Sequence, residues 1–210
     1  MALDEALLEA MPRLQTPVLR FYGWTENAAS FGYFQKFSEI ERAALLRPLV
    51  RRPTGGGLVP HDLDWTYSLA FPTTHEWYSV SAIESYRRVH DWLRMAFAEL
   101  KVTTELAPCC RKSEPGKCFV GHEKFDLLWH GKKIAGAAQR RSKLGLLIQG
   151  SVQPPPGSLK RGDWEMAMRL AGAKMFGAEW VDWSPDEGLA RRVAELAAQK
   201  YSLRSYNEKR

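Results

Sequence analysis

The stretch from Arg51 to Ser68 reads RRPTGGGLVPHDLDWTYS and sets two arginines and a threonine beside three successive glycines. Glycine has no Cβ and adopts positive φ, so backbone N–H groups of such a loop can come close to a bound group, while arginines add charge and forked donors. The stretch contains neither the Gly-x-Gly-x-x-Gly pattern nor the Gly-Lys-Ser/Thr ending of the common nucleotide loops. It therefore predicts a ligand loop of another kind.

Secondary structure around this loop follows from hydrophobic periodicity. Apolar residues at helical spacing predict a helix over Met1–Leu14 and a longer one over Ser81–Leu100. Aromatic and β-branched runs predict strands at Val18–Trp24, Ala28–Phe34 and Trp65–Phe71, the last of which ends at a proline.

The second half of the chain first repeats strands and then turns helical. Three strands are predicted at Phe125–His130, Lys133–Gln139 and Gly145–Val152, and the tight turn between the first two indicates an antiparallel meander. Helical stretches follow at Asp163–Phe176 and Pro185–Tyr201. Strands in runs, with helices at intervals, favour an α+β fold.

Composition limits the classes of protein. The 210 residues are 45% hydrophobic, which suits one folded unit with a sizeable core. Thirty basic residues against 24 acidic ones give a net charge of +6, and ten basic against four acidic residues fall between Lys101 and Lys143. A basic surface of this kind favours an acidic partner, although an ordinary solvated basic face explains it as well.

Targeting signals and cysteines point to the cytoplasm. The sequence has no apolar run near the ~18 residues that a membrane span needs, and its first eleven residues carry acidic residues instead of a basic leader region. Three cysteines, an odd number, predict free thiols instead of a disulfide framework. Cys109, Cys110, Cys118 and His122 do not have the paired spacing of structural zinc sites, so no metal site is predicted.

Three ordered segments carry a resemblance to a known family. They are Ala28–Gln35, the glycine loop with the following Tyr-Ser-Leu, and Gly131–Arg141, which reads GKKIAGAAQRR. Together these segments resemble the lipoate/biotin protein ligase superfamily over about residues 1–152. The resemblance implies a mixed, mostly antiparallel sheet with flanking helices, related to class II aminoacyl-tRNA synthetases. It also implies that residues 1–210 form a single catalytic domain without the separate C-terminal domain associated with adenylation.

The resemblance assigns site residues by matching position. It implies that an acyl chain lies in a tunnel whose wall includes residues of the glycine loop and of the following strand, namely Arg52, Thr54, Gly55, Gly56, Gly57 and His61. Lys133 would meet the acyl carbonyl, with Gly136 and Ala138 beside it. A compact ammonium suits that task because it stabilises negative charge developing on an acyl oxygen.

Cys118 favours one of the two chemistries found in the family. Ligases of the family activate free lipoate with ATP and Mg, whereas one branch of octanoyl transferases forms a thioester on a cysteine that precedes a phenylalanine, and Lys117–Val120 reads KCFV. The resemblance therefore implies a transferase that needs no cofactor, with Cys118 as nucleophile. Its partners would be octanoyl-acyl carrier protein and a lipoyl domain or the glycine-cleavage carrier protein.

Two alternatives stay open at this point. One is an ATP-dependent lipoate-protein ligase, supported by the glycine loop and Lys133. The other is a non-catalytic member of the family that only binds an acidic partner through its basic middle segment. A nucleic acid is disfavoured as that partner, because RNA-binding surfaces add exposed aromatic residues between the charges, and Phe125 and Trp129 alternate as core residues of a sheet do.

Overall fold

The computed structural model describes residues 1–111 and 121–209 and confirms the α+β class. Its main sheet has six strands in the order β1-β5-β9-β8-β7-β6, and every neighbouring pair is antiparallel. The strands of this sheet are β1 (Val18–Tyr22), β5 (Trp65–Phe71), β6 (Glu105–Leu106), β7 (Leu127–Trp129), β8 (Lys132–Ser142) and β9 (Gly145–Val152).

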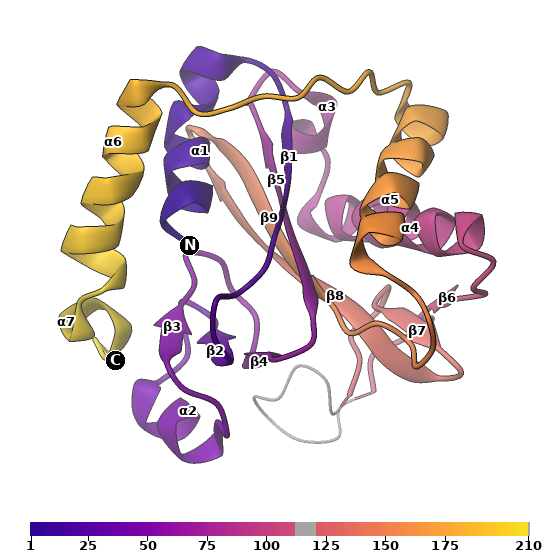
Figure 1. The fold of residues 1–210 in the computed structure, drawn as a ribbon, viewed down its shortest axis with the longest axis horizontal. Helices are drawn as coiled ribbons and strands as arrows, with labels where there is room; N and C mark the ends of the chain where they lie inside the picture. Colours follow the sequence, from indigo (N-terminus) through magenta and orange to yellow (C-terminus); the bar gives the residue numbers. More distant parts are fainter. Residues whose placement is uncertain (112–120, 210) are drawn as a thin grey trace.

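Helices cover both faces of this sheet (Figure 1). One face carries α1 (Ala2–Leu14) and α6 (Glu187–Leu196), and the other carries α4 (Ala82–Glu99) and α5 (Arg161–Phe176). The shorter elements are α2 (Phe37–Ala43), α3 (Glu76–Ser79), the π-helical turn η1 (Ala197–Tyr201) and α7 (Arg204–Asn207). Within residues 1–111 and 121–209, none of the helices combines the length and the apolar character needed to cross a membrane.

The long periodic segments were predicted well. Strand β5 has the predicted bounds, α1 and α4 agree within one residue at each end, and β7, β8 and β9 form the predicted antiparallel meander. The last long helix begins two residues later than predicted, at Glu187, because the Asp186 side chain caps it by accepting a hydrogen bond from the Leu189 N–H at 2.8 Å.

A second, three-stranded sheet was not predicted from the sequence. Its order is β3-β2-β4, with β2 (Ala28–Phe31) parallel to β3 (Leu49–Arg51) and antiparallel to β4 (Val59–His61). Only β2 was predicted as a strand, within Ala28–Phe34. The three-residue strands β3 and β4 give too little alternation to be recognised, and Pro60 inside β4 argues against a strand. This small sheet holds both ends of the glycine loop, since β3 leads into the loop and β4 leads out of it.

The two faces of the main sheet differ in polarity. The face toward α4 and α5 is apolar and carries Trp65, Tyr67, Leu69, Phe71, Leu146, Ile148 and Val152. Apart from Leu147, the residues between them on β5 and β9 are small or polar, among them Thr66, Ser68, Gln149 and Ser151, and these four are buried. Successive side chains of a strand point to opposite faces, so these polar residues share the α1 side of the sheet.

Gly150 of β9 is required by the apolar face. It pairs with Tyr67 of β5, and a Cβ at position 150 would overlap the Tyr67 ring. We expect Gly150→Ala to lower the free energy of unfolding by about 1–3 kcal/mol, because the packed core cannot absorb the added methyl group. Chemical denaturation measures this change.

Gly162→Ala is the matched control for this prediction. Among the described residues, no heavy atom lies within 4 Å of the place where a Cβ of residue 162 would be. Stability of the control is expected to be unchanged or slightly higher, since alanine favours helix. Equal stability of the two variants would contradict the steric role of Gly150.

Candidate active site

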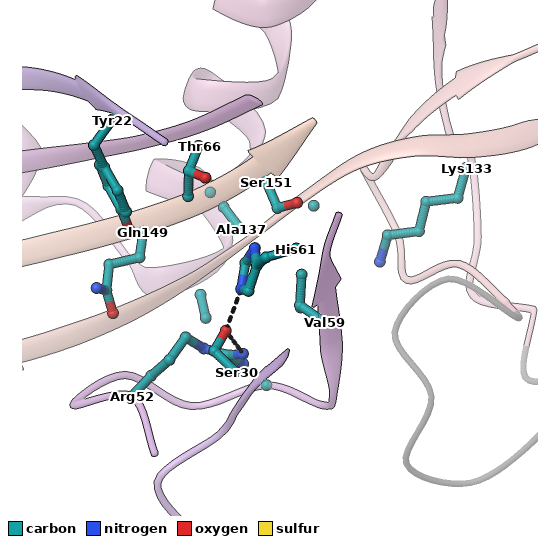
Figure 2. A pocket seen from close by; sticks show the side chains of 14 residues that line it. Tyr22, Ser30, Arg52, Val59, His61, Thr66, Lys133, Ala137, Gln149 and Ser151 are labelled. Atoms are coloured by element: carbon teal, nitrogen blue, oxygen red, sulfur yellow. Dashed lines mark hydrogen bonds between the residues drawn. The ribbon is translucent and has the colours of Figure 1, made fainter. Parts of the chain in front are cut away.

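A cavity of about 470 Å³, including its opening to solvent, lies between the small sheet and strands β5, β9 and β8 (Figure 2). Six of the ten residues predicted for the site line this cavity: Arg52, Gly56, His61, Lys133, Gly136 and Ala138. The structure therefore brings the glycine loop and the Lys133–Ala138 segment, far apart in sequence, to one cavity. It lies on the small and polar side of the sheet, toward α1.

Arg52 stabilises the conformation of the glycine loop through hydrogen bonds. Its side chain is buried and donates to the Ser30 Oγ at 2.9 Å, the Gly55 carbonyl at 2.9 Å and the Gly57 carbonyl at 2.8 Å. Gly56, between them, has a φ of 85°, which favours glycine. Gly55 and Gly57 do not line the cavity themselves, but their carbonyls accept hydrogen bonds from Arg52, and these bonds fix the conformation of the loop.

Arg51 has a different role from the one that the sequence suggested. Its guanidinium donates to the carbonyls of Tyr33 and Gln35 at 2.8 and 2.7 Å and to the carbonyl of Asn207 at 3.2 Å, and the side chain is fully buried. Arg51 therefore links β3 to the turn after β2 and to the C-terminal helix α7. The expectation that both arginines offer charge to a bound group is wrong for Arg51.

His61 belongs to a chain of buried hydrogen bonds along one wall of the cavity. Its Nε2 lies 2.6 Å from the Ser30 Oγ, and its Nδ1 lies 2.8 Å from the Asp64 Oδ2. Burial lowers the pKa of His61, and the nearby Arg52 adds to this effect, although Asp64 opposes it. The imidazole is therefore neutral at neutral pH, so Nδ1–H donates to Asp64 and Nε2 accepts from Ser30.

Neighbours hold the ring of His61 in place. The Trp24 indole stacks on it with ring centroids 4.0 Å apart, and the Trp24 Nε1 donates to the Thr66 Oγ1 at 3.1 Å. The Ser151 Oγ donates to the same Asp64 oxygen at 2.6 Å. These contacts with Trp24, Thr66 and Ser151 tie the His61–Asp64 pair to neighbouring strands and loops and so restrict its motion.

Lys133 lies at another part of the cavity and is paired with a buried carboxylate. Its Nζ is 2.7 Å from the Asp126 Oδ2, and the two side chains are 8% and 0% exposed. The backbone N–H of Glu123 donates to Asp126 at 2.7 Å, and the Tyr86 hydroxyl donates to the other carboxylate oxygen. Asp126 therefore fixes the place of the Lys133 ammonium.

Gly136 makes room for this ammonium. A Cβ at position 136 would lie 2.8 Å from the Lys133 Cε and 2.9 Å from its Nζ. Lys132 is exposed, as expected for neighbouring residues of one strand whose side chains point to opposite faces. Figure 2 shows the Lys133 side chain directed toward the cavity.

Three predicted site residues that the structure describes, Thr54, Gly55 and Gly57, do not line the cavity. Thr54 is buried behind it and donates through Oγ1 to the Gln149 Oε1 at 2.8 Å. Cys118 lies outside the described residues. Cys109 and Cys110 are exposed free thiols, in agreement with the prediction for these two.

Sequence reasoning missed Tyr22, Ser30, Val59, Thr66, Gln149 and Ser151, which also line the cavity. Four of these residues carry a signal that could have been used. Ser30 is a lone polar residue in a buried strand, and Thr66, Gln149 and Ser151 alternate with apolar residues. A buried polar residue in such a strand needs a partner, so it marks the polar side of a sheet.

His90 is buried near Asp126 and Lys133, and it makes the free energy of unfolding depend on pH. Burial lowers the pKa of His90 to about 4, against the opposing effect of Asp126 and with a small addition from Lys133. The unfolded chain therefore binds one more proton than the folded chain between about pH 6.5 and 4. The neutral, buried His90 therefore makes its full contribution to the free energy of unfolding above about pH 6.5, and this contribution is lost as the pH falls toward about 4.

We expect His90→Leu to flatten the decline of unfolding free energy below pH 6.5 by up to about 1.4 kcal/mol per pH unit. Urea denaturation at several values between about pH 4.5 and about pH 7 measures the slope. The control is His130→Asn at an exposed position, where the slope is expected to stay as in the wild type. An unchanged slope in His90→Leu would contradict the assignment.

Comparison with known proteins identifies the relatives of this chain. A family model described as the lipoyl protein ligase A/B catalytic domain matches residues 1–153. The octanoyltransferase LipM of Carboxydothermus hydrogenoformans is 38% identical over 160 residues, which cover 72% of this chain and 59% of that protein. The chain thus spans less than two thirds of the length of this relative.

Solved structures agree on the fold. A lipoate-protein ligase A bound with ATP superposes with a TM-score of 0.80 at 19% identity, covering 99% of this chain and 92% of the other. The bi-partite lipoate protein ligase of Thermoplasma acidophilum, described together with its E2 lipoyl domain, gives a TM-score of 0.75 at 19% identity, covering 99% and 89%. These similarities confirm the predicted lipoate ligase fold.

Proposed function

Because the chain belongs to the lipoyl protein ligase A/B catalytic domain family, we propose that it transfers an octanoyl or lipoyl group from a carrier-protein thioester to a lysine of a lipoyl domain, through a thioester on Cys118. The observation that carries this proposal is Lys133, a buried ammonium fixed by Asp126 at a cavity whose other lining residues from β8 are glycine and alanine. The identity of 38% with an octanoyltransferase supports the choice of acyl group.

The first step is thioester exchange. The Cys118 thiolate attacks the acyl carbonyl, the new S–C bond forms, and the carrier thiolate leaves and takes up a proton. Negative charge gathers on the acyl oxygen in the transition state, and the Lys133 ammonium stabilises it there. One thioester replaces another, so no nucleotide is needed for this step.

The second step is aminolysis of the acyl-enzyme. The amine of the acceptor lysine attacks the carbonyl, the S–C bond to Cys118 breaks, and an amide forms. The amine gives up a proton as the Cys118 thiolate gains one. Gly136 and Ala138 leave room for the acyl chain along β8 during both steps.

The acceptor is proposed to be a lipoyl domain or a glycine-cleavage carrier. The related bi-partite ligase is described together with its E2 lipoyl domain. The net charge of +6 on this chain suits acidic carrier domains, because charge complementarity speeds their encounter.

Incubation with octanoyl-acyl carrier protein tests the proposal. Intact mass spectrometry is expected to show one octanoyl adduct on the wild-type chain and none on Cys118→Ala. The matched control is the double variant Cys109→Ala/Cys110→Ala, which removes the two exposed thiols and should still acquire the adduct. An adduct of equal yield on Cys118→Ala would reject Cys118 as the nucleophile.

An ATP-dependent ligase is the second candidate, and the fold similarity to an ATP-bound ligase favours it. This reading needs ATP and Mg, with Lys133 beside the acyl-adenylate instead of the thioester. It predicts lipoate-dependent exchange between pyrophosphate and ATP. Exchange without an acyl adduct would favour the ligase, and an adduct without exchange would favour the transferase.

A further inference from the structure

The cavity has a direction that follows from the register of two strands. Gly136, beside the Lys133 ammonium, pairs with Ser151, and Ala138 pairs with Gln149. Two residues along a strand correspond to about 7 Å. In Figure 2, Lys133 lies on the right, and Gln149 and Tyr22 lie on the left. The cavity thus runs along β8 and β9 from Lys133 toward Gln149.

Gln149 is held rigidly at the far end. Its Nε2 donates to the Asp4 Oδ2 at 2.6 Å, and its Oε1 accepts from the Thr54 Oγ1 at 2.8 Å. Asp4 is fully buried and also accepts from the Ser68 Oγ and the Arg20 Nη1, each at 2.7 Å. The amide therefore has partners at both ends, and moving it would leave buried polar groups without hydrogen bonds.

Helix α1 covers the sheet beyond this point. Arg140 is the next residue after Ala138 on the same face of β8, and its Nη1 donates to Glu5 of α1 at 3.1 Å. Asp4, which fixes Gln149, belongs to the same helix. An acyl chain that enters beside Lys133 thus meets the Gln149 amide as its end wall.

We propose that Gln149 is the specificity-determining residue that limits the length of the acyl chain. The inference rests on the proposed acyl transfer and adds to it the residue that sets the upper limit of chain length. A longer chain must displace an amide that is anchored to α1 and to the glycine loop. A shorter chain leaves apolar space unfilled at the same wall.

Shortening the side chain at position 149 tests this proposal. Initial rates of adduct formation are measured by intact mass with hexanoyl, octanoyl, decanoyl and dodecanoyl carrier protein. Gln149→Ala should lower the preference for octanoyl over dodecanoyl by about tenfold or more, since each methylene at a fitted wall is worth about 10–200-fold in selectivity. If Gln149→Ala does not fold, Gln149→Asn, with one methylene fewer, carries the same test.

The opposite change should shift the preference the other way. Ala138 lies across from Gln149, so Ala138→Val narrows the same end and should favour hexanoyl over octanoyl. The control is Gln139→Ala, the same residue type on the other face of β8, where its Nε2 donates to the Ala82 carbonyl of α4 at 2.8 Å. Its chain-length profile should equal that of the wild type.

The outcomes separate the two proposals. If the wild-type chain acquires none of the acyl groups, the proposed transferase function fails. If the wild type is acylated and both Gln149→Ala and Ala138→Val keep its chain-length profile, the role of Gln149 is rejected while acyl transfer stands. A profile that changes in the predicted opposite directions supports the role.

Discussion

Lys133→Met is expected to lower the rate of octanoyl transfer by about 10²–10³-fold, the usual loss when one donor to a developing oxyanion is removed. Methionine keeps most of the length of the side chain but has no ammonium, so the acyl oxygen loses its charged partner in the transition state. The rate of adduct formation on the intact chain, at saturating octanoyl carrier protein, measures the effect.

Lys132→Met is the matched control. Lys132 is the exposed neighbour of Lys133 on β8, and its side chain points to the other face of the strand. The same loss of charge there should change the rate by less than about twofold, as expected for a screened surface charge. Equal loss of activity in both variants would show that general basic charge matters instead of the ammonium beside the cavity.

Asp126→Ala is expected to lower the free energy of unfolding by about 3–5 kcal/mol, the usual cost of removing one partner from a buried ion pair. The change leaves the Lys133 ammonium, the Tyr86 hydroxyl and the Glu123 N–H without the carboxylate that they share. Denaturation in guanidinium chloride measures the effect.

Two further variants define the cause of this loss. Asp91→Ala removes a carboxylate whose pair with Arg94 is partly exposed, and it should cost less than about 1 kcal/mol. The double variant Asp126→Leu/Lys133→Met should recover the part of the loss that comes from the unpaired ammonium, but not the part from the Tyr86 hydroxyl and the Glu123 N–H, and it should stay inactive. A loss below about 1 kcal/mol in Asp126→Ala would contradict the structural role of the pair.

Most of the main sheet and its longest helices could be predicted from the sequence. Strand β5, helix α4 and the β8–β9 hairpin are long enough for periodicity and turn residues to define them. Of the small sheet, only strand β2 could be predicted, because β3 and β4 have three residues each and β4 contains Pro60. Its pairing joins β2 to β3 and β4, and only the tertiary structure supplies those partners.

Some residues of the candidate site could likewise be predicted from the sequence, and others could not. The glycine loop and the Lys133 turn have local patterns, and the resemblance to a family assigned roles to their residues. Asp126 has no such pattern, since a carboxylate after Phe125 is common on a protein surface. The alternation around Gln149 indicates only the polar side of the sheet and not the partners of the amide. The roles of both residues follow from partners far away in sequence, such as Asp4, 145 residues from Gln149.

The sequence by itself determined the class of fold, the family, the glycine loop and the turn that carries Lys133. Local conformation and strand alternation depend on residues that are close in sequence, so the sequence contains the information that defines them. The tertiary structure alone decided which of the two loop arginines faces the cavity. Arg51 donates hydrogen bonds to carbonyls that are 16, 18 and 156 residues away, whereas Arg52 donates to carbonyls of the glycine loop. Long-range hydrogen bonds assign these two identical neighbours to different tasks, and no local pattern contains that information.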